Sequence, residues 1–237
     1  MEFPIRINKY IAHQGWASRR EADALIERGG VLVNGTPASL GQRIAARDTV
    51  TLNTAQPDRC YFAYYKGRGI ISHSPAEGEV DIATRLKQDY GLTDVYPVGR
   101  LDKDSEGLMI LTNDGRVTAP LLDPAATHEK EYEVTVDKNV TGLLINNFEK
   151  GVNIEGYRTK PARAQKHPHN AKKFMVILTE GKKHQIRRMC AALGYQVQSL
   201  KRVRIMNVEL GTLKPNQYRK LSGTELTTFL KELNIQK

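Results

Sequence analysis

The chain of 237 residues carries 36 Lys and Arg against 26 Asp and Glu, which gives a formal net charge of +10. No run approaches the roughly 18 consecutive apolar residues of a membrane-spanning helix, and the first residues lack the apolar core of a secretory signal. The cysteines, Cys60 and Cys190, are too few for a disulfide framework or a four-thiolate zinc site. The charge favours a polyanionic partner, although an ordinary soluble protein with a basic surface has the same composition.

Residues 5–52 have the pattern of a small separate unit. Apolar residues at helical spacing predict a helix over residues 5–13, and a second helix begins at Ser18, where Glu21 completes a capping box. The short strands and the linker predicted after them are VLVNG (31–35), VTL (50–52) and the polar stretch 53–59.

From Cys60 onward, β-branched and aromatic runs alternate with helical patterns. The predicted strands are CYFAYYK (60–66), GLMILT (107–112), EKEYEVTV (129–136), FMVILT (174–179) and VRIMNVEL (203–210). The predicted helices cover residues 81–90, 141–151, 184–193 and 223–233. Hairpin-connected strands with interspersed helices indicate an α+β fold rather than a regular βαβ alternation. We therefore expect one domain over residues 1–54 and a second over residues 55–237.

Basic residues surround the two N-terminal helices: Arg6, Lys9, Arg19 and Arg20. Such a cluster suits phosphate oxygens, but a solvated basic face has the same pattern. The stretch RINKYIAHQGWASRREADALIERGGVLVNG, with its R-x-x-K, its S-R-R triplet and its VNG turn, closely resembles the S-four-type RNA-binding domain. The resemblance implies a helical pair that binds RNA through shape and phosphate contacts.

The segment PVGRLDKDSEGLMILTNDG (97–115) places Arg100 and Asp102 just before an apolar strand, with Asp104 and Glu106 close behind. Its carboxylates alone could form a metal site, an acid/base pair or a solvated turn, although the ligand order of a hard-metal loop is absent. The segment is similar to the catalytic motif of the RsuA family of pseudouridine synthases, nearest the F-type members that act on large-subunit ribosomal RNA. The resemblance implies that Asp102 is the catalytic aspartate, that Arg100 helps to displace the target base, and that Asp104 is structural.

Further segments resemble the other motifs of that family. In HEKEYEVTV (128–136) the resemblance implies that Tyr132 stacks on the flipped uracil and takes part in proton transfer, while Lys130 lies on the same side of the strand. In TEGKKHQIRRMCAALGY (179–195) it implies that Ile186 and Arg187 complete the site. On the residues alone, Tyr132 could be ordinary packing and Arg187 an ordinary surface charge.

The stretch Tyr65-Lys66-Gly67-Arg68-Gly69 departs from the family pattern N-K-P-x-G. It keeps the lysine and the final glycine but lacks the asparagine and the proline. Glycine in place of proline loosens a turn, so we expect a change of local geometry and not of the reaction.

The resemblance implies an overall architecture and activity. A small N-terminal α/β RNA-binding domain is expected to precede a catalytic domain whose mixed, largely antiparallel central sheet is flanked by helices. We expect a bacterial, cytoplasmic, monomeric isomerase that uses no cofactor or metal and has no membrane contact. Its expected substrate is a uridine in large-subunit ribosomal RNA, with small-subunit ribosomal RNA or transfer RNA as alternatives.

The reaction needs Asp102 ionised in a closed pocket, and Arg187 is the candidate for its cationic neighbour. The rival hypothesis is a non-catalytic RNA-binding protein such as a ribosome-assembly factor.

Overall fold

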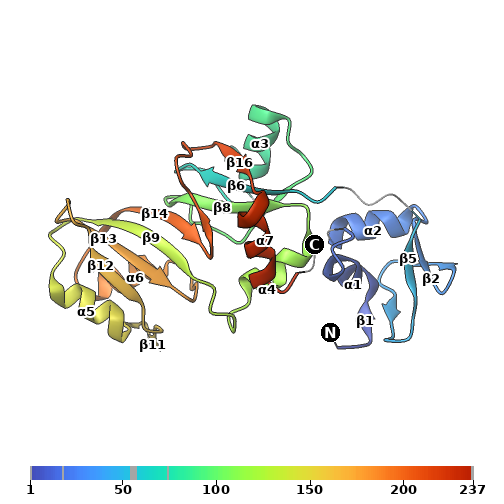
Figure 1. The fold of residues 1–237 in the computed structure, drawn as a ribbon, viewed down its shortest axis with the longest axis horizontal. Helices are drawn as coiled ribbons and strands as arrows, with labels where there is room; N and C mark the ends of the chain where they lie inside the picture. Colours follow the sequence, from blue (N-terminus) through green and yellow to red (C-terminus); the bar gives the residue numbers. More distant parts are fainter. Residues whose placement is uncertain (1, 18, 54–57, 74, 236–237) are drawn as a thin grey trace.

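The computed structural model describes residues 2–17, 19–53, 58–73 and 75–235, in a small N-terminal part and a larger part built on one sheet (Figure 1). The elements of the N-terminal part are β1 (Ile5–Arg6), α1 (Ile7–His13), α2 (Arg19–Glu27), β2 (Val31–Val33), β3 (Thr36–Pro37), β4 (Arg43–Ile44) and β5 (Val50–Leu52). Those of the larger part are β6 (Tyr61–Lys66), α3 (Ile82–Tyr90), β7 (Tyr96–Val98), β8 (Glu106–Thr112), η1 (Gly115–Val117), α4 (Thr118–Leu122), β9 (Lys130–Val136), α5 (Gly142–Lys150), β10 (Asn153–Ile154), β11 (Tyr157–Arg158), β12 (Arg163–Lys166), β13 (Lys173–Leu178), α6 (Gln185–Ala192), β14 (Val197–Ile205), β15 (Val208–Glu209), β16 (Tyr218–Lys220) and α7 (Gly223–Glu232). No helix within the described ranges is long and apolar enough to cross a lipid bilayer.

The N-terminal part has an apolar core of its own, in which Ile7 and Ile11 of α1, Ile26 of α2 and Val31 of β2 are buried together. Its strands β3, β2 and β5 form a separate sheet in that order. Both predicted helices and both predicted strands of this part are confirmed. The predicted cap Ser18 and the predicted domain boundary between residues 54 and 55 lie outside the described residues.

The larger part is built on a mixed sheet whose main path runs β12-β13-β9-β14-β8-β6-β16, with β15 paired to β14 and β7 to β8. Among the described strands of this sheet, β14 and β8 pair in parallel and all the other neighbours pair antiparallel. This confirms the predicted α+β fold with a mixed, largely antiparallel sheet.

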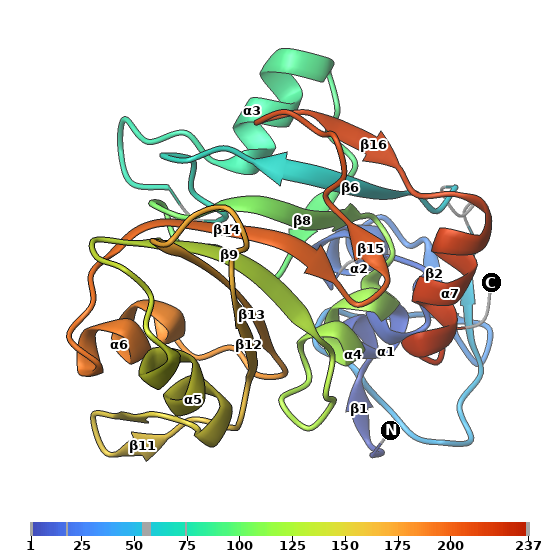
Figure 2. The same cartoon turned by 60° about the vertical axis from the view of Figure 1, so that its left-hand side comes forward.

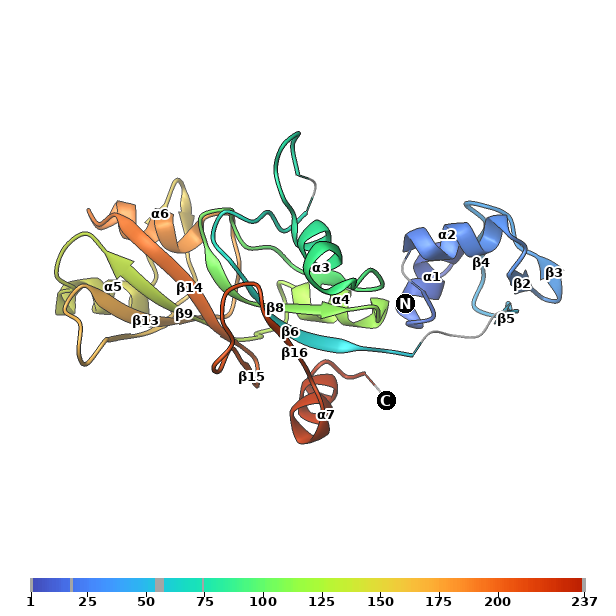
Figure 3. The same cartoon turned by 90° about the horizontal axis from the view of Figure 1, so that it is seen from above.

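Helices cover both faces of the sheet. The strand alternation of β6 places Tyr65 in one cluster with Phe229 of α7, whereas Tyr64 belongs to another cluster with Leu86 of α3. Figure 3 shows α3 and α7 on opposite sides of β6 and β8. At the other end of the sheet, α5 and α6 pack on β9 and β13 (Figure 2), where Phe148 and Phe174 lie in edge contact.

The close approach of β8 to β14 requires glycine at Gly107. Its φ is 111°, and a Cβ atom there would lie 2.2 Å from the carbonyl oxygen of Arg202. At this position the two backbones can therefore come so close only because Gly107 carries no side chain.

One predicted strand is wrong as a single element. The run VRIMNVEL is divided between the end of β14 and β15, because the chain turns back at Met206, whose φ is 51°, and Asn207. Several elements of two to four residues, such as β10, β11 and β12, were not predicted, since they are too short to carry a hydrophobic period.

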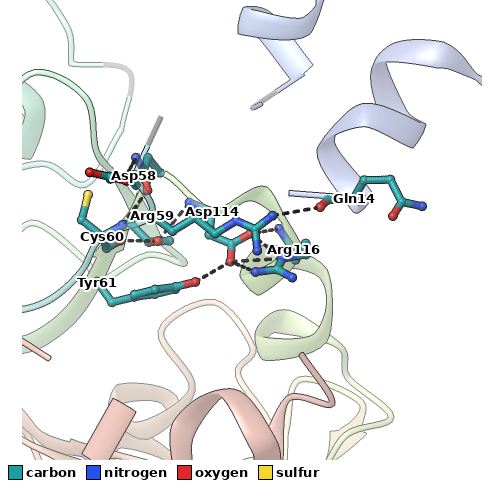
Figure 4. A network of polar contacts seen from close by, with 9 residues as sticks. Gln14, Asp58, Arg59, Cys60, Tyr61, Asp114 and Arg116 are labelled. Carbon is teal, nitrogen blue, oxygen red and sulfur yellow. Dashed lines mark hydrogen bonds and ion pairs between the residues drawn. The ribbon is translucent and has the colours of Figure 1, made fainter. Parts of the chain in front are cut away.

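The two parts of the chain meet where the end of α1 approaches η1. A Cβ atom on Gly115 would lie 2.7 Å from the carbonyl oxygen of Ala12, so the two backbones are in contact. Arg59 donates to the carbonyl of Gln14 at 3.5 Å, and beside it Arg116 binds the buried Asp114 (Figure 4). The end of the first helix therefore rests on the residues that follow β8.

Candidate active site

The segment that carries Asp102 lies between β7 and β8, and hydrogen bonds to its backbone fix it. The Ser72 hydroxyl donates to the Leu101 carbonyl at 2.9 Å and accepts from the Leu101 amide at 3.0 Å. The Gly69 amide donates to the Lys103 carbonyl at 2.8 Å. Because these partners belong to the loop after β6, that loop positions the backbone on both sides of Asp102.

Lys66 is a fully buried cation beneath the same segment. Its ammonium donates to the carbonyls of Ser105 at 2.6 Å, Gly67 at 3.2 Å and Lys103 at 3.4 Å. Burial lowers the pKa of Lys66 to about 8, and the nearby carboxylate of Asp102 opposes that shift. Below this pKa, Lys66 places a positive charge under the Asp102 segment.

Hydrogen bonds hold the turn after β6 (residues 67–69), although its sequence departs from the family pattern. The Gly67 amide donates to the Asn216 side-chain oxygen at 3.1 Å, and the Gly69 amide bonds to Lys103 as described. The missing proline is therefore compensated by hydrogen bonds from the glycine backbone, and Lys66 still reaches the Asp102 segment.

The carboxylate of Asp102 contacts the imidazole of His184 and forms an ion pair with it when the imidazole is protonated. Nδ1 of His184 lies 3.0 Å from Oδ2 of Asp102, and the two side chains are 44% and 32% exposed. His184 immediately precedes α6. It has φ 51°, in the left-handed region that few residues other than glycine and asparagine adopt.

Arg187 contacts the loop backbone. Its guanidinium donates to the carbonyl of Asp104 at 3.2 Å, the hydroxyl of Ser105 at 3.3 Å and the carbonyl of Val197 at 3.3 Å. The ion pairs of the described residues join Asp102 to His184 and not to Arg187. The ion-pair partner of Asp102 is thus a histidine three positions earlier, whereas carbonyl and hydroxyl oxygens of the loop bind the Arg187 guanidinium.

Tyr132 and Ile186 belong to one apolar cluster, and Leu101 packs against it. Tyr132 is 8% exposed and Ile186 is 3% exposed. The cluster thus brings a strand residue and a helix residue close to the segment of Asp102.

Arg100 and Lys130 are less closely tied to this group. Arg100 is exposed. The ammonium of Lys130 donates to the carbonyl of His128 at 3.2 Å, and burial lowers its pKa, with a smaller contribution from the charge of Arg202. Neither forms an ion pair with Asp102 among the described residues.

The basic residues predicted on the N-terminal helices lie at the surface where they are described. Arg6, Lys9 and Arg19 are exposed, and the side chain of Arg20 lies outside the described part. In the described ranges no three His, Cys, Asp or Glu side chains come together in a group that could hold a metal ion.

Sequence reasoning missed the roles of His184 and Ser72. His184 stands directly before the Q-I-R string, and this adjacency to two predicted site residues was the available signal. Ser72 had no such signal, because its contact with Leu101 depends on how the loop after β6 folds back.

Comparisons with known proteins identify relatives of both parts of the chain. A sequence model described as RNA pseudouridylate synthase matches residues 60–192, and the S4 domain matches residues 5–50. The dual-specificity RNA pseudouridine synthase RluF of Salmonella typhi is 40% identical over 236 residues, which cover 95% of this chain and 78% of that protein. Ribosomal large subunit pseudouridine synthase B of Bacillus subtilis is 34% identical over 229 residues, which cover 93% of each chain.

A solved structure has the same fold over the whole length. The crystal structure of a pseudouridylate synthase superposes with a TM-score of 0.69 at 28% identity, covering 97% of this chain and 99% of that one. The first sequence model spans more than half of the chain, and relatives that are at least 30% identical cover nearly all of it. The chain therefore belongs to the RNA pseudouridylate synthase family.

Proposed function

We propose that this enzyme isomerises a specific uridine in large-subunit ribosomal RNA, with Asp102 as the catalytic carboxylate. The observation that carries the proposal is the position of Asp102. Its backbone neighbour Leu101 is fixed by Ser72, while its carboxylate stays one-third exposed, so a reactive oxygen is both oriented and accessible to a ribose.

The reaction breaks the N1–C1′ bond, turns the uracil and joins C5 to C1′, so the C5 hydrogen leaves as a proton and N1 gains one. A carboxylate beside the sugar can attack C1′ or stabilise positive charge there. The ring of Tyr132 offers a flat face for the detached uracil, and Ile186 of the same cluster closes the apolar side. Arg187 contributes by binding the backbone of the Asp102 segment, through Asp104 and Ser105.

RNA is the substrate class that the net charge of +10 and the S4 match favour. The exposed Arg6, Lys9 and Arg19 are the proposed phosphate contacts, together with Arg20. Arg100, exposed beside the site, is proposed to offset part of the few kcal/mol that extrusion of a base costs.

The name of the Bacillus subtilis relative supports the large ribosomal subunit as target, and the name of the Salmonella relative supports testing a second RNA. We further propose that the enzyme works as a cytoplasmic monomer without cofactor or metal.

The test is release of tritium from uridine C5 in transcripts of large-subunit ribosomal RNA, small-subunit ribosomal RNA and transfer RNA, with chelator present. Asp102→Asn should lower the rate by at least about a thousandfold and leave RNA affinity within about twofold. Asp104→Asn is the matched control, because this neighbouring carboxylate is exposed and should be dispensable.

Full activity of Asp102→Asn would overturn the catalytic assignment. Tight RNA binding by the wild-type chain without release from any transcript would support the rival hypothesis of a non-catalytic RNA-binding protein. Release from small-subunit or transfer RNA alone would keep the chemistry and replace the proposed target.

A further inference from the structure

We propose that His184 is a positioning residue for the reaction: its Nδ1–H orients the Asp102 carboxylate through Oδ2 and leaves Oδ1 directed to the ribose. This inference rests on the proposed function of Asp102. It assigns His184 a role that depends on one donor atom, and so it differs from general packing or RNA binding.

The contact places a ring nitrogen of one side chain at ion-pair distance from a carboxylate oxygen of the other. Nδ1 of His184 lies 3.0 Å from Oδ2 of Asp102, and a turn of the partly exposed imidazole would direct an Nδ1–H at this oxygen. A histidine that donates from Nδ1 can do so in both its neutral and its charged form. Asp102 therefore keeps an oriented partner whichever form the imidazole has.

The backbone at His184 indicates that the contact is maintained at a cost. A left-handed conformation costs a residue other than glycine about 1 kcal/mol or more. Glycine would remove this cost, but it would also remove the side chain that reaches Asp102. A strained residue whose side chain meets the candidate catalytic group is the arrangement expected where strain serves function.

The neighbouring residues fix this conformation. Gln185, 4% exposed, accepts from the Lys182 amide at 2.9 Å and donates to Glu180 at 2.6 Å. Glu180, 7% exposed, also accepts from the Tyr157 hydroxyl at 2.5 Å. Buried Gln185 and Glu180 thus hold the loop before α6, and with it the backbone that carries His184 toward Asp102.

The bond also joins two elements that are distant in sequence. Asp102 is carried by the segment before β8, whereas His184 is carried by the start of α6. Arg187, one turn further along α6, binds the backbone of Asp104 in the same segment. The helix start therefore holds the Asp102 segment through its backbone with Arg187 and its carboxylate with His184.

The test compares His184→Asn with His184→Gly in the tritium-release assay, using the full chain. Both replacements tolerate the left-handed backbone, but only asparagine places a nitrogen donor close to the position of Nδ1. We expect His184→Gly to lower kcat about 10- to 100-fold with KM for RNA within twofold, and His184→Asn to restore kcat to within about fivefold of wild type.

Three outcomes of this comparison would overturn the proposal. They are an unchanged kcat in His184→Gly, equal loss in both variants, and a change confined to KM, which would make His184 an RNA contact. Asp102→Asn and the wild-type chain are measured alongside. A wild-type chain that releases no tritium would refute the proposed function, whereas the three outcomes above would refute only the role of His184.

A measurement without turnover completes the test. Nitrogen NMR of the His184 ring in the free enzyme should show a proton on Nδ1 in the wild-type chain and a changed Nδ1 signal in Asp102→Asn. A neutral ring that carries its proton on Nε2 in the wild-type chain would contradict the donor role, even if the substrate RNA were unknown.

Discussion

Asp102 and Asp114 stand at opposite ends of β8, and the chain surrounds the two carboxylates differently. Asp114 is completely buried and accepts from the Tyr61 hydroxyl at 2.6 Å and from the Arg116 guanidinium at 2.8 Å. Burial alone would raise the pKa of Asp114, but the hydrogen bonds from Arg116 and Tyr61 outweigh it and hold the pKa below its ordinary value. Asp102 is about one-third exposed, and its ion-pair partner among the described residues is His184.

On the proposed function, this difference separates a structural carboxylate, Asp114, from a reactive one, Asp102, within a single motif. The oxygens of Asp114 already have donors, so they have little capacity left for a ligand. Asp102 has an oriented side chain with an oxygen still available. Charge compensation differs as well, because Arg116 binds the Asp114 carboxylate directly, whereas the buried Lys66 binds the carbonyls around Asp102.

The largest effect that tests this contrast is expected from Asp114→Asn. Loss of this buried charge should lower the free energy of unfolding by about 3 kcal/mol, because Arg116 would lose its carboxylate. Asp102→Asn should change it by less than about 0.5 kcal/mol. Urea unfolding of the full chain measures both, and turnover per folded Asp114→Asn molecule should stay within about threefold of wild type. A larger loss of stability in Asp102→Asn than in Asp114→Asn would contradict the assignment of Asp114 as the structural carboxylate.

The next effect concerns Lys66 and depends on pH. The pKa of Lys66 is about 8 in the folded chain and near 10.5 in the unfolded chain, so between these values the unfolded chain binds more protons. The free energy of unfolding of wild type relative to Lys66→Met should therefore rise by about 3 kcal/mol from pH 8 to pH 10.5. Urea midpoints across this range measure the difference, with the exposed Lys172→Met as control. If the difference in free energy of unfolding between wild type and Lys66→Met does not vary with pH, burial does not lower the pKa of Lys66.

A smaller effect is expected from Ser72→Ala. The substitution removes both hydrogen bonds to Leu101 and should cost about 1–2 kcal/mol of stability. Because the backbone beside Asp102 then loses its fixed position, kcat should fall about tenfold while RNA affinity is kept. Thr227→Ala is a suitable control, since the Thr227 hydroxyl donates to the exposed carbonyl of Gly223 in its own helix. Unchanged turnover would mean that other contacts suffice to orient Asp102.

The smallest effect is expected from Glu79→Gln. The ion pair between Glu79 and Lys103 spans 2.7 Å but is exposed to solvent, so its loss should leave the free energy of unfolding nearly unchanged. Turnover should likewise stay near the wild-type value. A large loss of activity would show that this surface pair, rather than the backbone bonds of Ser72 and Gly69, orients the Asp102 segment.

The sequence predicted the longer elements well, because their hydrophobic periods are complete. The helices over residues 81–90, 141–151, 184–193 and 223–233 are all confirmed. The motif resemblance also selected Asp102, Tyr132 and Ile186, which the fold brings to one region. Their individual roles stay predictions.

The contacts between distant segments could not be predicted. Nothing local in the sequence specifies that His184 meets Asp102, or that Arg187 prefers the Asp104 carbonyl to a carboxylate. Both depend on the approach of α6 to the segment before β8. The turn at Met206 was missed for a related reason, since a left-handed methionine has no sequence signature.

The parallel pairing of β8 with β14 has a consequence for how the enzyme matures. Each strand is completed by a different stretch of chain: β14 by its neighbour β9, which in turn pairs with β13, and β8 by β6, which in turn pairs with the later β16. His184 belongs to the first of these assemblies, which holds β14, and Asp102 to the second, which holds β8. Such long-range pairing is slow compared with local structure. On the proposed function, either assembly alone lacks one of these two side chains, so we expect a partly folded molecule to bind RNA without cleaving a glycosidic bond.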